Sequence, residues 1–600
     1  MSSSETSLAA APRPVSTSAP GVPAPPSERR LLVAVAGALA FLLWGQFLQP
    51  HGDFYEFRES GLALIRGEIP PSLKRSPAWP LAINLVARAL PWHWLTDIPA
   101  EQAAAQTLNG LLLVGIAIAF HRLAARWAPR PAPWLTLLLL ATPTLWWAAA
   151  GTLLEPLLIL LVLVTCERSA ADGRGRYLAA AGALLVRPDC AGLLLGVAAA
   201  DLLRRRPWPG VLLRSCAAAA PAAAWLALTL LLWRTHSRDH YLTHLRFDID
   251  ACLAALDRVF DCAAGGRRFL AALELSEPAQ WLTLVLPPAL AILALTGAVA
   301  LVRRGRLAEL AALLGFAGAY FAGVAAFRFT ADRYYLPLAA IVLALAAPGA
   351  AVLLTLVRSR RSSLFVTAGL TALLALFLSA EVGWWSTFHP RDARTAYGIL
   401  SAIVAGPILL GVLRRSPPPE REAGVAPPPA REPKGQTRRR VGKRPVIVLL
   451  FLLLGSSGAR QLPYLFAEHD AVPPLVAAAR WTREHLPPPA RVLSGVGGLL
   501  ALHAGENSAR FPGLEEIEAA QWSDILAECR AGGIEYILWY ADFYAEQGEF
   551  YIRQWRLDRF KRLDDELPPE IERIHEFPGE RPVWIGRIRP PGELPAPAAK

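Results

Sequence analysis

This sequence carries little charge. Asp, Glu, Lys and Arg make up only 18% of its 600 residues, whereas hydrophobic residues make up 54% and the mean hydropathy is +0.33. Such a chain, with many apolar blocks near the ~20 residues that cross a bilayer core, does not form one soluble domain. The composition indicates a multi-pass α-helical membrane protein with some soluble mass attached.

Cysteine is also scarce, and its spacing gives no metal motif. The six Cys form no paired metal-ligand pattern. Cys252 and Cys262 share one loop, where a straight helix would hold them about 15 Å apart. A disulfide would need a turn between them, so free thiols are favoured.

The net charge of +12 is concentrated between apolar blocks. Residues 414–444 alone hold ten Lys or Arg against three Glu, and other basic clusters stand at the ends of apolar blocks. This placement is typical of topology signals on the cytoplasmic side of a membrane, not of a nucleic-acid site. We therefore expect no nucleic-acid partner and a position in the cytoplasmic (inner) membrane, with membrane lipids as partners.

Two apolar segments are ambiguous in the predicted threading. Residues 77–94 are short and bounded by Pro, and residues 177–203 are broken by Arg187-Pro188-Asp189. If 77–94 lies along or dips into the membrane and 177–203 is a re-entrant pair, three Arg-rich loops fall inside, as the positive-inside rule favours; a crossing 77–94 is the alternative. The other predicted spans are 31–49, 102–121, 133–149, 153–167, 208–233, 281–302, 307–327, 333–357, 364–382, 397–413 and 446–461.

The predicted architecture is an α-helical polytopic membrane protein of about 11–13 membrane helices with a small C-terminal α/β domain outside the cytoplasm. The N-terminus is expected in the cytoplasm. The polar C-terminal part reads as alternating helices and strands, with an amphipathic helix predicted over 514–533. The predicted parts are a disordered tail 1–30, a catalytic transmembrane module 31–413, a basic Pro-rich cytoplasmic linker 414–445, a last span 446–461 and the outer domain 462–600.

The stretch PHGDFYEFRESG at residues 50–61 places carboxylates and aromatic rings directly after the first apolar block. We expect Asp53 at the outer interface, where water and lipid headgroups meet. A carboxylate there suits a general base acting on a substrate that comes partly from lipid. Because Asp is also a preferred N-cap, a cap for the helix starting near Phe54 is the alternative.

Four segments then follow in an order typical of one family. They are GDFYEFRESGLALIRGEIPPSLKRSPAWPLAINLVARALPW, TLLEPLLILL, ALLVRPDCAGLLL and DRYYLPLAAIVLAL. This order resembles the GT-C membrane glycosyltransferases over about residues 30–410, more narrowly the protein O-mannosyltransferase and aminoarabinose-transferase branch and its bacterial relatives. The family's frequent tandem acid pair is absent, because Phe54 follows Asp53; Glu56 is the candidate second acid.

The resemblance implies an enzyme that moves a sugar from a polyprenyl-phosphate donor to a glycan, lipid or protein acceptor on the outer face, with inversion. Asp53 and Glu56 would be catalytic, Asp53 by deprotonating the acceptor hydroxyl. Glu155 would orient the acceptor or, with Asp53, hold a divalent cation such as Mg or Mn. Its alternative is an interfacial acid at a helix start, ahead of Pro156.

Basic residues are the candidates for the donor phosphate, since a guanidinium fork matches phosphate geometry. For Arg333 the alternative is an interfacial anchor, and for Arg187 an internal ion pair with Asp189. The phosphate candidates are Arg333, Arg187, Lys74 and Arg75, and the rings expected to line the site are Tyr55, Tyr334, Tyr335 and Trp79.

Two other classes compete with an enzyme. A transporter or flippase for a lipid-linked or anionic substrate would carry ion-binding residues near mid-membrane, usually in repeated halves, and we find no repeat. A membrane-anchored binding protein that acts through 462–600 would not need a dozen spans. The sequence therefore favours the glycosyltransferase.

Overall fold

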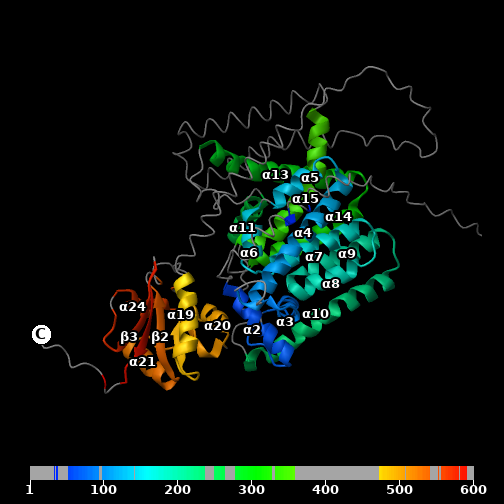
Figure 1. Cartoon of the computed structure of the whole chain (residues 1–600). Helices are drawn as coiled ribbons and strands as arrows, with labels where there is room; N and C mark the ends of the chain where they lie inside the picture. Colours follow the sequence, from blue (N-terminus) through cyan, green and yellow to red (C-terminus); the bar gives the residue numbers. More distant parts are fainter. Residues whose placement is uncertain are drawn as a thin grey trace, which may run out of the picture.

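The structure is a computed structural model in which two bodies can be described, a helical body and a smaller body with a sheet (Figure 1). It describes residues 52–92, 98–140, 142–236, 249–263, 277–326, 332–357, 472–540 and 556–590, except 74, 507, 566 and 580, together with a few isolated positions. The predicted tail, the linker, the three spans between 364 and 461 and most of span 31–49 lie outside these residues.

The helical body consists of helices joined mostly by short turns, and its most extensive contacts join helices that are not adjacent in the sequence. The 3-10 turns η2 and η4 interrupt it where the chain changes direction. The elements are α2 Gly52–Arg66, α3 Ala78–Ala89, α4 Ala100–Trp127, α5 Ala132–Leu140, α6 Pro143–Ala150, α7 Glu155–Ala170, α8 Arg176–Val186, η2 Pro188–Cys190, α9 Ala191–Leu203, α10 Trp208–His236, α11 Ile249–Ala263, α13 Glu277–Arg303, α14 Leu307–Ala326, η4 Asp332–Tyr335 and α15 Leu336–Val357.

Within the described residues, four helical segments are long and apolar enough to cross a membrane. α5 and α6 would add a fifth, but the pair bends by 54° at its break. The predicted span 133–149 is therefore broken near Thr142, where Pro143 begins α6. The four segments are Ala100–Trp127, Trp208–Leu232, Leu307–Ala326 and Arg333–Leu353.

Several helix ends meet at one polar end of the helical body, which we call the basic end. Trp127 Nε1 donates a 2.8 Å hydrogen bond to Glu309, so the end of α4 meets the start of α14. Asp172, between α7 and α8, pairs with Arg206, after α9, at 2.8 Å. The charge of Glu309 also acts on Arg204. These contacts gather the Arg-rich loops 121–130, 167–176, 204–207 and 303–306, as the preferred threading requires.

The predicted re-entrant pair 177–203 is a helical hairpin. Arg176 Nη2, at the start of α8, lies 2.8 Å from Asp201 Oδ1, near the end of α9, so both ends of the hairpin are at the basic end. The break at Pro188 falls in η2, at the opposite end of the helical body. Proline removes a backbone donor there, and the chain turns back.

The segment 77–94 does not form a spanning helix. α3 has 12 residues, about 18 Å of helix at 1.5 Å per residue, and its C-cap Leu90 is extended. α3 packs against α2, where a Cβ on Gly61 would collide with the carbonyl oxygen of Pro80 and the side chain of Asn84. The short helix agrees with the threading in which this segment does not cross.

Glycines let two helix pairs approach closely. A Cβ added at Gly192 of α9 would collide with Gly315 of α14, and one at Gly196 with the backbone of Ala311. α13 and α15 meet in the same way at Gly297 and Gly349. Small residues spaced four apart are a common means of packing membrane helices, because lipid gives no hydrophobic drive for association.

The C-terminal body is a four-stranded sheet with helices packed on it. The strand order is β1-β2-β4-β3; β1 pairs with β2 in parallel and the other pairs are antiparallel. Its core includes Val492, Ile537 and Ile585, each fully buried. The elements are α19 Val472–His485, β1 Arg491–Ser494, α20 Gly497–Ala504, η6 Ser508–Arg510, η7 Leu514–Glu516, α21 Trp522–Ala531, β2 Ile534–Tyr540, η8 Leu557–Phe560, α24 Arg562–Asp565, β3 Ile571–Phe577 and β4 Val583–Ile588.

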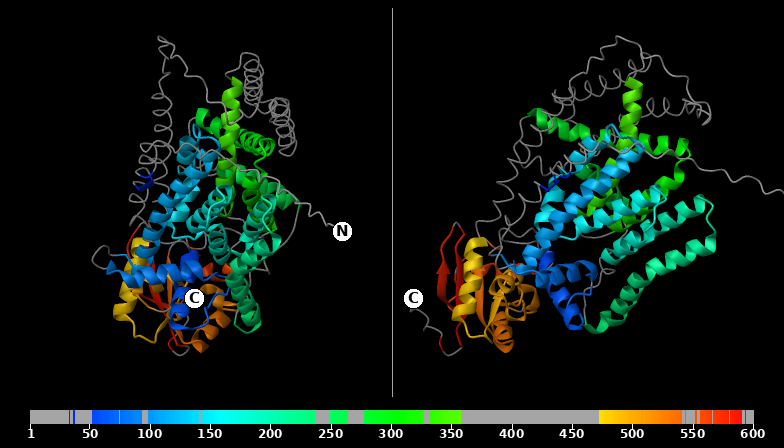
Figure 2. Two further views of the ribbon diagram at one scale, coloured as in Figure 1. Left: turned by 90° about the vertical axis from the view of Figure 1, so that its right-hand side faces the viewer. Right: turned by 45° about the vertical axis from the view of Figure 1, so that its right-hand side comes forward.

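The predicted small α/β domain is therefore present, with one correction. The helix predicted over 514–533 begins only at Trp522. Glu528 of that helix accepts hydrogen bonds from the backbone amides of Glu518 and Ala519, which fixes the preceding segment as a loop. In Figures 1 and 2 this body, coloured yellow to red, lies against the end of the helical body that carries α2 and α3, coloured blue.

Cys252 and Cys262 both lie on the single helix α11 and are not joined by a disulfide. The expectation that they do not form a disulfide is confirmed. α11 lies between the predicted spans 208–233 and 281–302, yet it packs against α15 and η4. Its position brings Arg258 over the ring of Tyr335, at 5.9 Å from the ring centre.

Candidate functional site

The first turn of α2 carries two carboxylates that bind one arginine. Arg75 Nη2 donates to Asp53 Oδ1 at 2.7 Å, and Arg75 Nε donates to Glu56 Oε2 at 2.6 Å. Asp53 and Glu56 are three residues apart, which puts them on one helix face. Arg75 also lies 5.1 Å from the ring centre of Phe57. The turn between α2 and α3 therefore folds back over the start of α2.

The second oxygen of Asp53 binds Arg333, which is distant from Asp53 in the sequence. Arg333 Nη2 donates to Asp53 Oδ2 at 2.6 Å, and Arg333 Nε lies 3.6 Å from Glu155 Oε1. Glu155 and Arg333 are buried, 2% and 5% exposed. The result is an alternating chain of charges, Glu56–Arg75–Asp53–Arg333–Glu155, drawn from three separate segments. We call it the carboxylate–arginine chain.

The break between α6 and α7 positions Glu155. Thr152 in this break has a positive φ of 62°, a conformation that L-residues rarely adopt and that its surroundings must hold. Its carbonyl oxygen accepts a 3.2 Å hydrogen bond from Trp79 Nε1, and Asn109 donates to Leu153 and Ala149. α7 then begins at Glu155, so the carboxylate stands at the end of a helix.

A second ion pair lies beside the carboxylate–arginine chain. Arg187 donates to both oxygens of Asp189, at 2.7 and 3.2 Å. The guanidinium groups of Arg187 and Arg333 lie 5.2 and 5.1 Å from the ring centre of Tyr334, so one ring contacts both cations. The hairpin tip thus belongs to the site, and Arg187 forms the internal ion pair that was its alternative interpretation. Ser76 Oγ donates to Leu185 O and ties the tip to α3.

The C-terminal body docks on the helix that carries Asp53. A Cβ added at Gly498 of α20 would lie 2.5 Å from Cγ of Tyr55, and Leu502 shares a buried cluster with Phe54 and Trp79. Burial raises the pKa of Tyr55, whose hydroxyl has no hydrogen-bond partner among the described residues. A change in the position of α20 therefore acts directly on α2.

Glu515 brings a further carboxylate toward the site. Glu515 is exposed to solvent, yet the protein atoms around its carboxyl group raise the pKa of that group, and the charges of Glu516 and Glu56 raise it further. No pattern around Glu515 singles it out in the sequence, because its proximity to Glu56 arises only from the docking of the two bodies.

The described residues do not form a metal site. Asp53 and Glu155, the predicted pair of ligands, both face Arg333. No group of three or more His, Cys, Asp or Glu side chains that could hold a metal occurs in the part of the chain that the structure describes. The divalent cation stays a prediction from the sequence.

The structure brings most of the sequence-predicted site residues together. Lys74 lies outside the described residues. Two predicted rings have other contacts: Tyr55 packs against the C-terminal body, and Tyr335 is buried in the core below Arg258. Whether they line a substrate path stays a prediction. The residues that converge are Asp53, Glu56, Arg75, Trp79, Glu155, Arg187, Arg333 and Tyr334.

Comparison with known proteins gives structural likeness but no sequence match. No protein-family model and no curated protein matches the sequence. The chain is similar to ArnT from Cupriavidus metallidurans in the apo state, with a TM-score of 0.49 and 15% identity, over 95% of this chain and 98% of that one. The structure of that protein bound to undecaprenyl phosphate gives a TM-score of 0.47 and 16% identity, over 95% and 99%.

These two structures are of one protein, with and without a bound polyprenyl phosphate. At these scores the likeness concerns the course of the chain, and the chemistry has to be derived from the site's own geometry.

Proposed function

We propose that the protein is a membrane glycosyltransferase that moves a sugar from a polyprenyl-phosphate donor to an acceptor on the outer face of the membrane. The observation that carries this proposal is the position of Asp53 between Arg75 and Arg333, at 2.7 and 2.6 Å. One carboxylate and two guanidinium groups are what such a transfer needs, a base for the acceptor and cations for the leaving phosphate.

The donor phosphate would compete with Asp53 for the two arginines. Each guanidinium presents several donors in a planar fork that matches phosphate oxygens, and it keeps its charge at any working pH. Once the phosphate occupies Arg75 and Arg333, Asp53 loses its partners and becomes available to accept a proton. The base would thus be released when the donor is bound.

The transfer then balances as follows. The acceptor hydroxyl gives its proton to Asp53, and its oxygen forms a bond to the anomeric carbon from the face opposite the phosphate. The bond between that carbon and the phosphate oxygen breaks, and polyprenyl phosphate leaves with the electron pair, which inverts the anomeric carbon. Arg333 and Arg75 stabilise the charge that develops on the departing phosphate.

Glu56 and Glu155 would be positioning residues at the two ends of the carboxylate–arginine chain. Glu56 binds Arg75 at 2.6 Å, and Glu155 lies 3.6 Å from Arg333. Each keeps its arginine anchored when Asp53 moves away. All these charges stand at helix ends or turns, whereas transporters usually carry such residues on interrupted helices at mid-membrane.

The test is turnover by the purified full-length protein with a panel of polyprenyl-phosphate sugars in lipid nanodiscs. We expect one donor to release polyprenyl phosphate, and Asp53→Asn to lower turnover by about 10²- to 10⁴-fold, the usual contribution of a general base. Glu59→Gln is the matched control, because Glu59 lies on the same helix but pairs with Arg58 at 2.8 Å. Release from no donor in the panel, or equal rates for Asp53→Asn and wild type, would contradict the proposal.

A further inference from the structure

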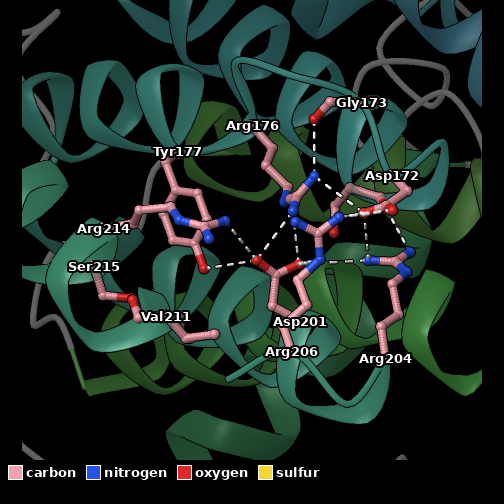
Figure 3. Close-up of polar contacts among 11 residues, drawn as sticks. Asp172, Gly173, Arg176, Tyr177, Asp201, Arg204, Arg206, Val211, Arg214 and Ser215 are labelled. Atoms are coloured by element: carbon pink, nitrogen blue, oxygen red, sulfur yellow. Dashed lines mark hydrogen bonds and ion pairs between the residues drawn. The ribbon is translucent and has the colours of Figure 1, made fainter. Parts of the chain in front are cut away.

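A second charged cluster lies at the basic end, far from Asp53 along the hairpin. Asp201 is fully buried, and Arg176 binds both its oxygens, at 2.8 and 3.0 Å (Figure 3). Tyr177 donates to the same carboxylate at 3.1 Å. Arg206 and Arg214 approach it at 3.6 and 3.7 Å.

The cluster has more positive than negative charge. Arg204 lies between Asp172 and Asp201, at 3.8 and 3.9 Å, and completes a set of four arginines against two aspartates. Two positive charges are therefore left over. The charge of Glu309 also acts on Arg204, but Glu309 already faces Arg126 and Arg306 at 3.5 and 3.8 Å. We call the six residues the basic-end cluster: Asp172, Arg176, Asp201, Arg204, Arg206 and Arg214.

The arginines of the cluster differ in what they are free to bind. Arg176 is buried and serves as a clamp on Asp201, with 5% of its side chain exposed. Arg206 is 32% exposed; its Nη2 donates to both oxygens of Asp172 at 2.8 Å, while its Nε reaches Asp201 only at 3.6 Å. Arg214 is 44% exposed and reaches Asp201 only at 3.7 Å. Arg204 Nη1 is buried and has no hydrogen-bond partner among the described residues. The cluster thus carries surplus positive charge, and the partly exposed Arg206 and Arg214 present it on the outer side.

Apolar side chains surround this outer side. Trp208 and Leu213 at the start of α10 are 67% and 72% exposed, and Leu202 and Leu203 at the end of α9 are each 50% exposed. Only 11% of the apolar stretch of α10 is buried against other described residues. A helix with such a surface faces lipid, so the arginines lie where headgroups meet acyl chains.

We propose that the basic-end cluster binds the headgroup phosphate of an anionic phospholipid in the leaflet on the basic side. Basic pockets between membrane helices are known to hold such headgroups, and a phosphate diester supplies the charge and the acceptors that the cluster lacks. Arg206, Arg214 and Arg204 would hold the phosphate, while Leu213 and Trp208 contact the acyl chains. The site is separate from the carboxylate–arginine chain and does not depend on the proposed transfer.

The experiment measures lipid binding by native mass spectrometry of the full-length protein. Phosphatidylglycerol, cardiolipin and phosphatidylcholine are the probes. The test variant is Arg206→Gln/Arg214→Gln, which keeps the buried Arg176–Asp201 clamp. The control is Arg130→Gln/Arg174→Gln, which removes two exposed charges from the same end of the protein but outside the cluster. Thermal unfolding of each variant checks the fold.

We expect wild type and the control to bind phosphatidylglycerol at least about tenfold more tightly than phosphatidylcholine, and the test variant to lose this preference, since each basic residue near a membrane surface contributes measurably to anionic-lipid binding. If the test variant does not fold, Arg206→Lys/Arg214→Lys replaces it. This variant keeps the charge but loses the fork, so we expect it to keep a weakened preference.

Three outcomes would overturn the proposal. Wild type could show no preference for anionic lipid, or the test variant could retain the preference, or the control could lose it equally. A separate arm adds millimolar inorganic phosphate. If phosphate alone stabilises wild type against heat and not the test variant, the ligand is a soluble phosphate and the assignment to lipid is wrong.

Discussion

Asp53 and Arg333 are 280 residues apart in the sequence, yet Asp53 Oδ2 accepts a hydrogen bond of 2.6 Å from Arg333 Nη2. The bond joins the first turn of α2, outside the spanning helices, to the 3-10 turn that precedes α15. Because Arg75 holds the other oxygen, the carboxylate is fixed from two sides. A ligand that binds Arg75 or Arg333 therefore has to compete with Asp53 for the guanidinium group.

Arg333 also supports Glu155, so its removal has a structural cost that can be separated from its chemical role. Arg333→Gln leaves the buried Glu155 carboxylate without its cation, and we expect a loss of about 3–5 kcal/mol in the free energy of unfolding, as for other broken buried pairs. Arg333→Gln/Glu155→Gln should recover most of that stability but not the turnover. Thermal unfolding and donor turnover of both variants check this. Equal stability of the single and double variants would show that Glu155 does not depend on Arg333.

The contact between Gly498 and Tyr55 predicts that the C-terminal body controls the position of α2. In Gly498→Ala the new Cβ would lie 2.5 Å from Cγ of Tyr55, so the ring or α20 has to move. We expect lower turnover with a normal overall fold, and partial recovery in Gly498→Ala/Tyr55→Ala, where the added methyl has room. Gly318→Ala is the control, because a Cβ added at Gly318 would meet no described atom within 4 Å. Full activity of Gly498→Ala would argue against control by this contact.

The two aspartates of the basic-end cluster should differ in their importance for stability. Asp201→Asn removes a buried anion from the middle of several guanidinium groups, so we expect a loss of about 3–5 kcal/mol in the free energy of unfolding. Asp172 is 44% exposed, and solvent screens its ion pairs. Asp172→Asn should therefore cost about 1 kcal/mol or less. The unfolding temperatures of the two variants decide between this ranking and its reverse.

The hydrogen bonds to the Glu528 carboxylate make the stability of the C-terminal body depend on pH. Hydrogen bonds from the backbone amides of Glu518 and Ala519 lower the pKa of its carboxyl group below the ordinary value of 4.5. The stabilisation by the ionised form is therefore fully present above pH 4.5 and is lost as the pH falls through the lower folded pKa. The effect is small, because the group is exposed to solvent.

We expect Glu528→Gln to speed hydrogen exchange in residues 517–520 of the full-length protein at neutral pH, since the amide side chain holds the two backbone donors less well. The same substitution at exposed Glu535, a control on β2, should leave this segment unchanged. The stability difference between wild type and Glu528→Gln should shrink in acid. A difference that stays constant down to pH 3 would mean that the charge of Glu528 is not what holds the loop.

Much of the fold follows from local patterns in the sequence. Apolar length predicts α4, α10, α14 and α15, and the Arg187-Pro188 break predicts the hairpin. The loop before α21 could not be predicted in this way, because the helical pattern of 514–533 competes with three backbone bonds made by Glu528. α11 lies in the core because it packs against α15. Its sequence has the periodicity of an ordinary amphipathic helix, so the sequence does not show where the helix packs.

The candidate site follows from the sequence in part. Asp53, Glu155 and Arg333 each stand beside an apolar block, and the order of the family-like segments singles them out from the other charges in such positions. Arg75 and Glu56 are close enough in sequence to be expected beside Asp53. Contacts between bodies could not be expected, since the packing of Tyr55 on Gly498 depends on how a separate domain docks. Residue types and spacing carry no information about that docking.

The most direct test of the account compares wild type with Asp53→Asn for both binding of polyprenyl phosphate and release of polyprenyl phosphate from the active donor. Because Asn removes the negative charge that competes for Arg75 and Arg333, the variant should bind polyprenyl phosphate at least as tightly as wild type. Its release of polyprenyl phosphate should nevertheless fall by about 10²-fold or more, because the base is lost. Unchanged release at matched stability would contradict the assignment of Asp53 as the base, and loss of binding would contradict its competition with the phosphate.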